Sequence, residues 1–341
     1  MDSITQMALG GVIGEAGFRE KLGGKAVVLG FLGGMLPDLD IVTGVILADP
    51  WVHLTVHRGI THSLFLVPFF SAVLAWVFWR WGKKETSFWW WYLLAFLVFF
   101  THPLLDCCTS YGTQIFAPFS DVRIAWNCVS IVDVFYTVPL LLTLVCCPLV
   151  KKWWPQKNTS WIGVGVLLLT TLYLIYGSLN GNLALNRTLA DADSKDVAIL
   201  RAEVYPQLTT VWVWRTVVKT PDGFLLGRTN TLLGERLTST FLENDCDPLI
   251  EKARSLEKIK VYRWFADDLL REKITRHTQG DGIINFFDMR YGNPMETDHY
   301  LWGARVYFDR DGNLGRVERF YNRSFSMGEL IERVVKGITT P

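Results

Sequence analysis

Residues 88–106 read FWWWYLLAFLVFFTHPLLD, and this stretch decides what kind of protein the chain is. It contains no Asp, Glu, Lys or Arg from Phe88 to Leu105. A helix of this length crosses the hydrocarbon core of a bilayer, which is about 30 Å thick. The Trp and Tyr residues at its start are typical of a membrane interface. The stretch therefore predicts a membrane-spanning helix.

Other apolar stretches lie on both sides of this one. Three are long enough to span a membrane, namely Ser63–Trp79, Ile131–Val150 and Trp161–Tyr176. Two shorter ones, Ile4–Gly17 and Ala26–Leu36, each carry glycines four residues apart, a spacing that lets helices approach closely in lipid. We therefore expect about four full spans and two short, tightly packed helices.

The last part of the chain has a different character, because charged residues gather in 186–341. Leu208–Thr220 is rich in Val, Trp and Thr, as strands are. Tyr300–Phe308 and Gly315–Tyr321 flank a turn-forming Asp-Arg-Asp-Gly-Asn sequence and predict a hairpin. Helices are expected near 247–272 and 326–337. The predicted architecture is a polytopic α-helical membrane domain, residues 1–180, followed by a soluble α+β domain, residues 186–341.

The distribution of basic residues predicts the orientation in the membrane. One side of the bundle holds only Arg58 and Arg123 before the soluble domain. The other side holds Arg19, Lys21, Lys25, Arg80, Lys83, Lys84, Lys151, Lys152 and Lys157. The basic side is expected to face the cytoplasm. The segments 37–62 and 102–133 and the soluble domain would then lie on the periplasmic side of a bacterial inner membrane.

Charge and cysteine usage narrow the function classes. The formal net charge of +1 gives no sign of a nucleic-acid partner. The polar, acidic start of the chain predicts no cleavable signal peptide. There is no Cys-x-x-Cys, which argues against a zinc ribbon or a thioredoxin-type motif. The sequence does not decide whether Cys128 forms a disulfide with Cys107 or Cys108.

Histidine and aspartate carry the chemistry of the membrane domain. Four of the six histidines fall between residues 53 and 102. His102 and Asp106 are four residues apart and share one helix face. Ionisable residues in membrane segments are costly and are candidates for function, and mixed imidazole and carboxylate ligands suit zinc, manganese or iron. The residues expected to converge at the outer end of the bundle are Asp38, Asp40, His57, His62, His102, Asp106 and Asp133.

Each of these residues also has a plainer interpretation. Asp38 and Asp40 could cap a helix after the proline that precedes them. His102 and Asp106 could be a hydrogen-bonded pair. Arg58 could balance the carboxylates or bind a substrate anion through two N–H groups. The hypothesis of a metal site depends on all of these residues lying together on the same predicted side of the membrane.

Several short motifs resemble a known family. They are MDSITQ at 1–6, LPDLD at 36–40, HRGITHS at 57–63, THPLLD at 101–106, SYGT at 110–113 and SIVD at 130–133. In order and spacing they resemble the YdjM-like family of LexA-regulated, membrane-bound metal-dependent hydrolases of the bacterial inner membrane. The resemblance covers roughly residues 1–180.

This resemblance implies a ligand set, because the His-x-x-x-Asp pattern is similar to one in zinc-dependent phospholipase C and P1-type nucleases. The ligands that it implies are Asp40, His57 or His62, His102 and Asp106, with Asp2 as a further candidate because the N-terminus joins the metal site in the phospholipases.

From these observations we expect a membrane-bound metal-dependent hydrolase. One to three divalent ions, preferably zinc, would be held by Asp40, His57, His62, His102 and Asp106. Metal-activated water would attack a phosphoester of a lipid or lipid-linked substrate at the outer face of the membrane. Asp38 or Asp133 would orient ligands or act as general base, and Arg58 would steady the anion. The alternative is a non-catalytic membrane protein that binds or transports ions, with a soluble domain that binds a partner.

Overall fold

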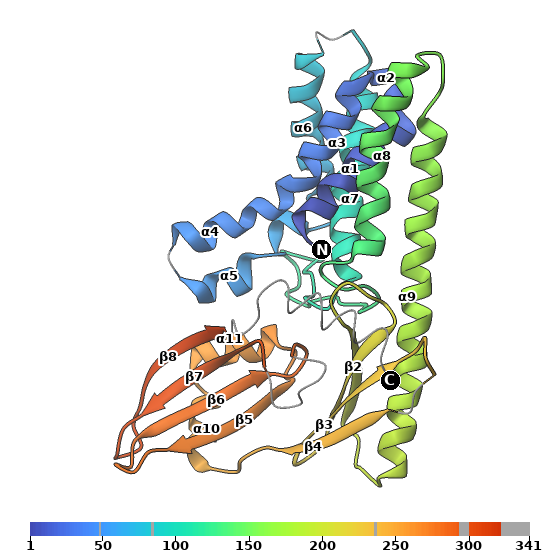
Figure 1. Cartoon of the computed structure of the whole chain (residues 1–341). Coiled ribbons are helices and arrows are strands. Elements are labelled where there is room, and N and C mark those ends of the chain that lie inside the picture. Colours follow the sequence, from blue (N-terminus) through green and yellow to red (C-terminus); the bar gives the residue numbers. More distant parts are fainter. Residues whose placement is uncertain (48, 83–84, 235–236, 293–299, 322–341) are drawn as a thin grey trace. The chain divides into compact units, whose positions relative to one another are not determined.

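The computed structural model describes residues 1–341 except 48, 83–84, 235–236, 293–299 and 322–341 (Figure 1). The chain divides into two compact units. The first contains Met1–Leu47, Val56–Leu179 and Leu208–Thr210, and the second contains Ala48–Thr55, Asn180–Gln207 and Val211–Pro341.

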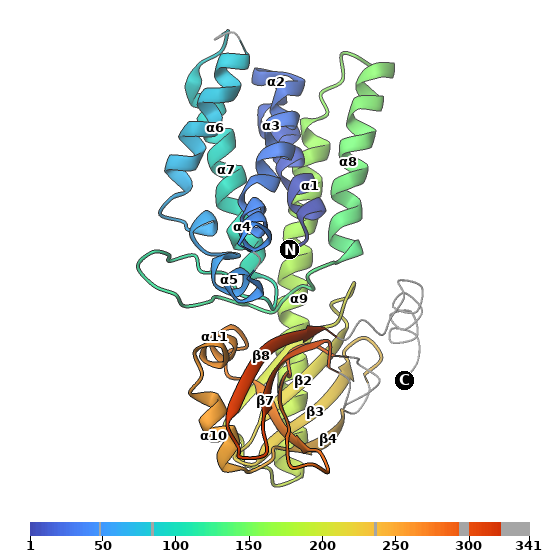
Figure 2. The same ribbon diagram turned by 90° about the vertical axis from the view of Figure 1, so that its left-hand side faces the viewer.

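The first unit is helical. Its elements are α1 (Ser3–Ile13), the π-helix η1 (Gly14–Phe18), α2 (Arg19–Leu22), α3 (Gly24–Met35), the 3₁₀ turn η2 (Leu36–Asp40), α4 (Ile41–Ile46), the 3₁₀ turn η3 (Ile60–His62), α6 (Val67–Trp81), α7 (Phe88–Cys107) and α8 (Val134–Trp153). The short α5 (Pro50–Val56) lies mostly in the second unit, and the long α9 (Ser160–Ser194) continues from the first unit into the second. Figure 2 shows α6, α7, α3, α1 and α8 running alongside one another.

The structure confirms a polytopic helical membrane domain. Within the described residues, four helical stretches are long and apolar enough to cross a membrane, namely Gly24–Thr43, Phe88–Cys107, Val134–Trp153 and Ser160–Ser194. Pro50–His62 and Val67–Trp81 qualify only together, as a pair bent by 73°. The set of spans therefore differs from the predicted one. The stretch at 26–36, expected to be too short, reaches spanning length because η2 and the start of α4 continue it to Thr43, whereas the stretch at 63–79 belongs to the bent pair.

The expected close packing of α1 on α3 is also confirmed. A Cβ atom added at Gly10 would lie 2.0 Å from the carbonyl oxygen of Gly30, and one added at Gly34 would lie 2.3 Å from that of Gln6. Such distances exclude any side chain, so the two backbones touch at these glycines. This contact brings the start of α1 beside the end of α3.

The outward surfaces of α8 and α9 are apolar. Leu142, Leu168 and Leu172 are 55–62% exposed. An extended apolar surface of this kind is rare in water-soluble proteins and suits contact with lipid chains.

The second unit contains two four-stranded antiparallel sheets, each with its strands in sequence order. The first sheet is β1 (Arg201–Pro206), β2 (Val213–Lys219), β3 (Gly223–Asn230) and β4 (Thr238–Glu243), and the second is β5 (Leu270–Arg276), β6 (Gly282–Asp288), β7 (Trp302–Phe308) and β8 (Leu314–Tyr321). Between the sheets in sequence lie α10 (Pro248–Arg254) and α11 (Glu257–Phe265). The predicted hairpin is confirmed as β7 and β8. The helical segment expected up to residue 272 was too long, because it ends in β5. The helix expected at 326–337 lies outside the described residues.

Strand β2 is covered on both faces, which explains its nearly continuous burial. On one face, Val218 packs with Leu225 and with Ala192 of α9. On the other face, Val217 joins a core with Phe224 and with Met289 and Tyr300, which lie just after β6 and just before β7 of the second sheet. The charged side chain of Arg215, which also lies on β2, is buried as well.

The cysteines whose pairing the sequence does not decide lie close together but form no disulfide. Cys107, Cys108 and Cys128 are all free thiols. The Cys128 Sγ atom donates to the carbonyl oxygen of Cys108 at 3.5 Å.

Candidate metal centre

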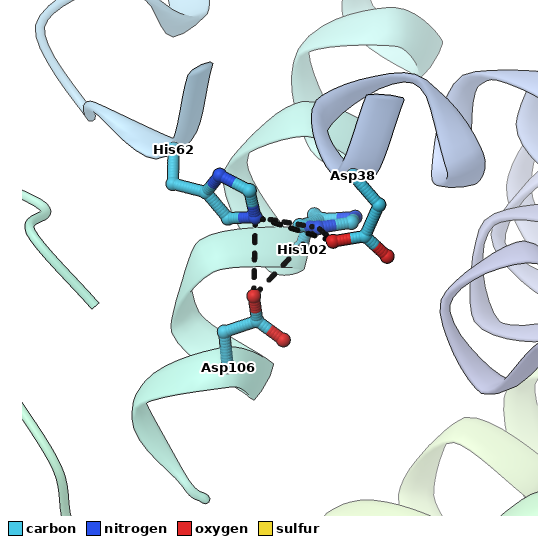
Figure 3. A group of neighbouring side chains, drawn as sticks. All are labelled: Asp38, His62, His102 and Asp106. Carbon is cyan, nitrogen blue, oxygen red and sulfur yellow. Dashed lines mark hydrogen bonds and ion pairs between the residues drawn. The ribbon is translucent and has the colours of Figure 1, made fainter. Parts of the chain in front are cut away.

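Four buried side chains meet at one end of the helical unit (Figure 3). Asp38, His62, His102 and Asp106 each offer one ligand atom, and these atoms lie within 4.8 Å of one another. The four residues are 0–6% exposed. The group thus combines two imidazoles and two carboxylates in a site closed to bulk water.

Local structure explains how these residues come together. His102 and Asp106 project from the last turns of α7, one turn apart. Asp38 comes from η2, where Pro37 opens a 3₁₀ turn at the end of α3. His62 comes from η3, the turn that ends the first helix of the bent pair just before the break. Irregular backbone within an apolar segment is tolerated where it is buried in protein, and here it delivers two of the four ligands.

The distances between ligand atoms fit one metal ion. The two Nε2 atoms of His62 and His102 are 3.1 Å apart. The Asp38 Oδ1 atom lies 3.5 Å and 3.4 Å from these nitrogens, and the Asp106 Oδ2 atom lies 3.2 Å and 3.8 Å from them. Tetrahedral bonds of about 2.0–2.1 Å place ligand atoms about 3.3–3.4 Å apart. The observed separations bracket that value.

The outer nitrogens of the two imidazoles fix their tautomers. His102 Nδ1 lies 2.9 Å from the carbonyl oxygen of Gly34, which can only accept. His62 Nδ1 lies 2.9 Å from Thr61 Oγ1, and that hydroxyl donates to Asp40 Oδ2 at 2.7 Å. Both Nδ1 atoms are therefore donors, and in the neutral rings both Nε2 lone pairs face the centre of the group. Lone pairs 3.1 Å apart repel unless a positive charge lies between them.

The carboxylates are held in a similar way by α1. Ser3 Oγ donates to Asp38 Oδ2 at 2.8 Å, and Gln6 Nε2 donates to Asp106 Oδ1 at 2.8 Å. The Met1 amine also contacts Asp106 Oδ1. Sequence reasoning did not assign Ser3 or Gln6 to the site, although their spacing of three puts them on one helix face. These contacts leave the other carboxylate oxygens turned inward.

One of these inward atoms is a buried acceptor without a hydrogen bond from the described residues. Asp106 Oδ2 is buried and accepts no hydrogen bond from the described residues. The Met1 amine and Arg58 lie against Asp106 and offset its charge, whereas the buried carboxylate of Asp38 faces the two imidazoles. A buried carboxylate is costly in a low-dielectric interior unless its charge is neutralised. Two imidazole nitrogens and two carboxylate oxygens are donor atoms that suit a divalent cation, so these residues fit a metal ion.

Asp40 and His57 lie beside the four-residue group and outside it. Asp40 Oδ1 is 2.7 Å from His57 Nδ1, and Asp40 Oδ2 accepts from the backbone N–H of Arg58 at 3.0 Å. The His57 and His62 ring centroids are 6.1 Å apart. In this arrangement Asp40 supports His62 through Thr61, and His57 is the more exposed of the two imidazoles, at 11% against 0%.

Arg58 is buried against Asp106. Its Nε atom lies 3.2 Å from Asp106 Oδ2, and its Nη1 atom donates to Thr109 Oγ1 at 2.8 Å. The guanidinium carbon lies 4.9 Å from the centroid of the Tyr111 ring. Arg58 also has a φ of +60°, a left-handed conformation that is unusual for a residue other than glycine. The Arg58 side chain is thus held against the carboxylate of Asp106.

Asp2 and Asp133 both serve as helix caps outside the four-residue group. Asp2 accepts from the backbone N–H of Thr5 at the start of α1. Asp133 accepts from the N–H groups of Phe135 and Tyr136 and from the hydroxyl of Tyr173.

Comparison with known proteins places the chain in a family. The sequence profile of the YdjM inner membrane protein matches residues 1–182. The chain is also similar to the protein YfhP of Bacillus subtilis (strain 168), described as uncharacterized. The two are 23% identical over 329 residues, 91% of this chain and 92% of YfhP. No solved structure matches the chain significantly. Because the profile covers more than half of the 341 residues, this protein belongs to the YdjM inner membrane protein family.

Proposed function

We propose that the protein is a membrane-bound, metal-dependent hydrolase that acts on a phosphoester of a lipid or lipid-linked molecule. The observation that carries this proposal is the donor set of Asp38, His62, His102 and Asp106. Structural zinc sites are typically built from thiolates, whereas catalytic sites use imidazole and carboxylate ligands. Cys107 is adjacent in sequence to Asp106 and yet is not part of the group.

The four side chains would hold the metal, preferably zinc, and the surrounding residues would keep them aligned. When bound, such a cation supplies Lewis acidity and makes water a nucleophile near neutral pH. Gly34 and Thr61 hold the imidazoles in the tautomer that faces the ion. Ser3 and Gln6 hold the carboxylates. Arg58 offsets the charge of Asp106 and would pair with a substrate anion that enters the site.

Access for a lipid substrate is supported by exposed aromatic side chains near the metal centre. Phe65, three residues after the ligand His62, is 55% exposed and stacks edge-on with Phe119 at a centroid distance of 5.0 Å. Phe119 is 77% exposed and Trp126 is 54% exposed. Aromatic side chains of this kind favour the membrane interface. Together with the basic loops at the other end of the bundle, they support a site at the periplasmic membrane surface and a periplasmic C-terminal domain.

A second candidate function is favoured by the burial of all four ligands. A closed shell of four protein ligands is the usual form of a non-catalytic metal site. In that case the ion would hold η2 and η3 against α7, and the second unit would recognise a partner. Hydrolysis requires one ligand, most simply a carboxylate, to release a coordination position.

Metal content and esterase activity, measured on the same samples, separate these functions. Wild type in detergent is compared with the double variant His102→Ala/Asp106→Ala for bound metal and for phosphodiesterase and phosphomonoesterase activity. A matched control is His277→Ala/Asp281→Ala, which removes a His/Asp pair with the same spacing that is 50% and 45% exposed.

The hydrolase proposal requires metal and activity in wild type and in the control, and the loss of both in the site variant. Metal without turnover on either substrate type supports the non-catalytic candidate. Wild-type protein that binds no metal contradicts both.

A further inference from the structure

Arg215, in the second unit, is buried and forms no ion pair with any of the residues that the structure describes. It lies on β2 and is only 3% exposed. Its Nε donates to the carbonyl oxygen of Met289 at 2.8 Å, which links the two sheets. Its Nη2 atom is buried and has no hydrogen-bond partner among the described residues. Burial lowers the pKa of Arg215 to about 10, so the group is still a cation at pH 7.

The nearby carboxylate of Asp288 is already occupied. Both Asp288 oxygens accept from Arg290, through its Nε at 3.0 Å and its Nη2 at 2.7 Å. The backbone N–H of Arg290 and the indole N–H of Trp302 add two further donors. With four donors on two oxygens, Asp288 has little capacity left for Arg215.

The strand register places a second cation next to Arg215. Arg228 of β3 is directly opposite Arg215, so both side chains leave the same face of the sheet. Opposed residues on neighbouring antiparallel strands have Cβ atoms about 4.5–5.5 Å apart, and like charges in such a pair destabilise a sheet. Tyr205 of β1 is opposite Arg215 on the other side, which makes a row of one tyrosine and two arginines.

A buried guanidinium with an unmade hydrogen bond is expensive, because a buried charge must be paired to offset the loss of hydration. The Arg215 guanidinium, with the carboxylate of Asp288 already occupied, supplies planar, charge-assisted donors of the kind that bind oxyanions, and the positive charge of Arg228 on the same face favours an anion there. We propose that the buried face of the first sheet at Arg215, beside Arg228, is a binding site for a small oxyanion, a phosphate or a carboxylate group. The site lies in the second unit and does not depend on the metal centre.

Hydrogen–deuterium exchange of the full-length protein tests this proposal. The protein is treated with EDTA, so that the metal centre cannot bind the probe, and exchange is measured in inorganic phosphate, in acetate and in chloride at equal ionic strength. We expect phosphate or acetate to slow exchange saturably in β2 and at Met289, with no change in the β7–β8 hairpin. The anion that acts at the lower concentration identifies the group, phosphate or carboxylate.

Two variants separate binding from a purely structural role of Arg215. Arg215→Met removes the charge at similar volume and should abolish the effect of the anion. It should also leave the melting temperature in chloride unchanged or raised, because a buried charge without an ion pair is costly to desolvate. The control Arg201→Met removes an arginine of β1 that is 38% exposed and pairs with Glu203 and Asp267, and it should respond to anions like wild type.

Wild-type exchange in β2 that is the same in phosphate, acetate and chloride overturns the proposal, whatever the variants do. An anion effect of equal size in Arg215→Met also overturns it, because the ion would then bind elsewhere. Loss of the anion effect in Arg215→Met alone supports the site.

Discussion

The Nδ1 atom of His102 lies 2.9 Å from the carbonyl oxygen of Gly34, a residue 68 positions earlier in the chain. This contact joins α7 to the end of α3 and forces the metal-facing Nε2 of His102 to carry a lone pair in the neutral ring. Because Gly34 has no side chain, the same residue also lies directly against the backbone of Gln6 in α1. The glycine that packs α3 on α1 therefore also orients a ligand.

The first prediction concerns this double role of Gly34. In Gly34→Ala the new Cβ would meet the carbonyl oxygen of Gln6 at 2.3 Å, so α3 must move away from α1. We expect zinc affinity, measured by competition with a chelator, to fall by about 10- to 100-fold, the usual effect of losing the support of a ligand. Gly17→Ala is the control, because a Cβ there meets nothing within 4 Å. Equal affinities of the two variants would show that Gly34 does not orient His102.

The second prediction separates His62 from His57. Because His62 Nε2 faces the other ligands and His57 does not belong to the group, His62→Ala should remove the bound metal. His57→Ala should keep the metal stoichiometry of wild type, with an affinity reduced by no more than about tenfold. Metal content by atomic absorption decides between them. Loss of metal in His57→Ala would instead make this imidazole a ligand, as the sequence motif implies.

The third prediction tests the support of His62 by Thr61. The Thr61 hydroxyl links His62 Nδ1 to Asp40 Oδ2. Thr61→Val keeps the shape but removes the hydroxyl, and we expect metal affinity to fall by about 10- to 100-fold. Thr61→Ser keeps the hydroxyl and should bind like wild type. If valine and serine give the same affinity, the hydroxyl has no role in ligand orientation.

The fourth prediction is a pH dependence in the second unit. The backbone N–H of Leu249, and then Arg276, hold the pKa of Asp247 below its usual value. Because the pKa is lower in the folded state, the stabilisation by Asp247 is present above its unfolded pKa of about 3.9 and is lost as pH falls through the folded value.

Asp247→Ala, which removes the N-cap of α10, should therefore cost about 1 kcal/mol at pH 7 and less as the pH falls below about 4. Amide exchange in α10 reports this local stability across the pH range. Asp247→Asn keeps a capping oxygen and should lose much less at pH 7. An alanine variant with the same deficit at pH 3 and pH 7 would contradict the role of the charged cap.

Features that depend on local composition could be predicted from the sequence. A span needs about 20 apolar residues in a row, so Phe88–Cys107 is recognisable without its neighbours. Helical periodicity alone puts His102 and Asp106 on one face. The β7–β8 hairpin follows from its turn residues and from the strands beside them.

Features that depend on long-range contacts were decided only by the tertiary structure. Asp38 and Asp40 differ by two positions, and only the direction of the η2 turn decides that Asp38 faces the other ligands while Asp40 supports His62. The roles of Ser3 and Gln6 follow from the glycine contacts between α1 and α3. The physical reason is that a sequence pattern determines which face of an element a side chain occupies, whereas the packing of distant elements determines what that face meets.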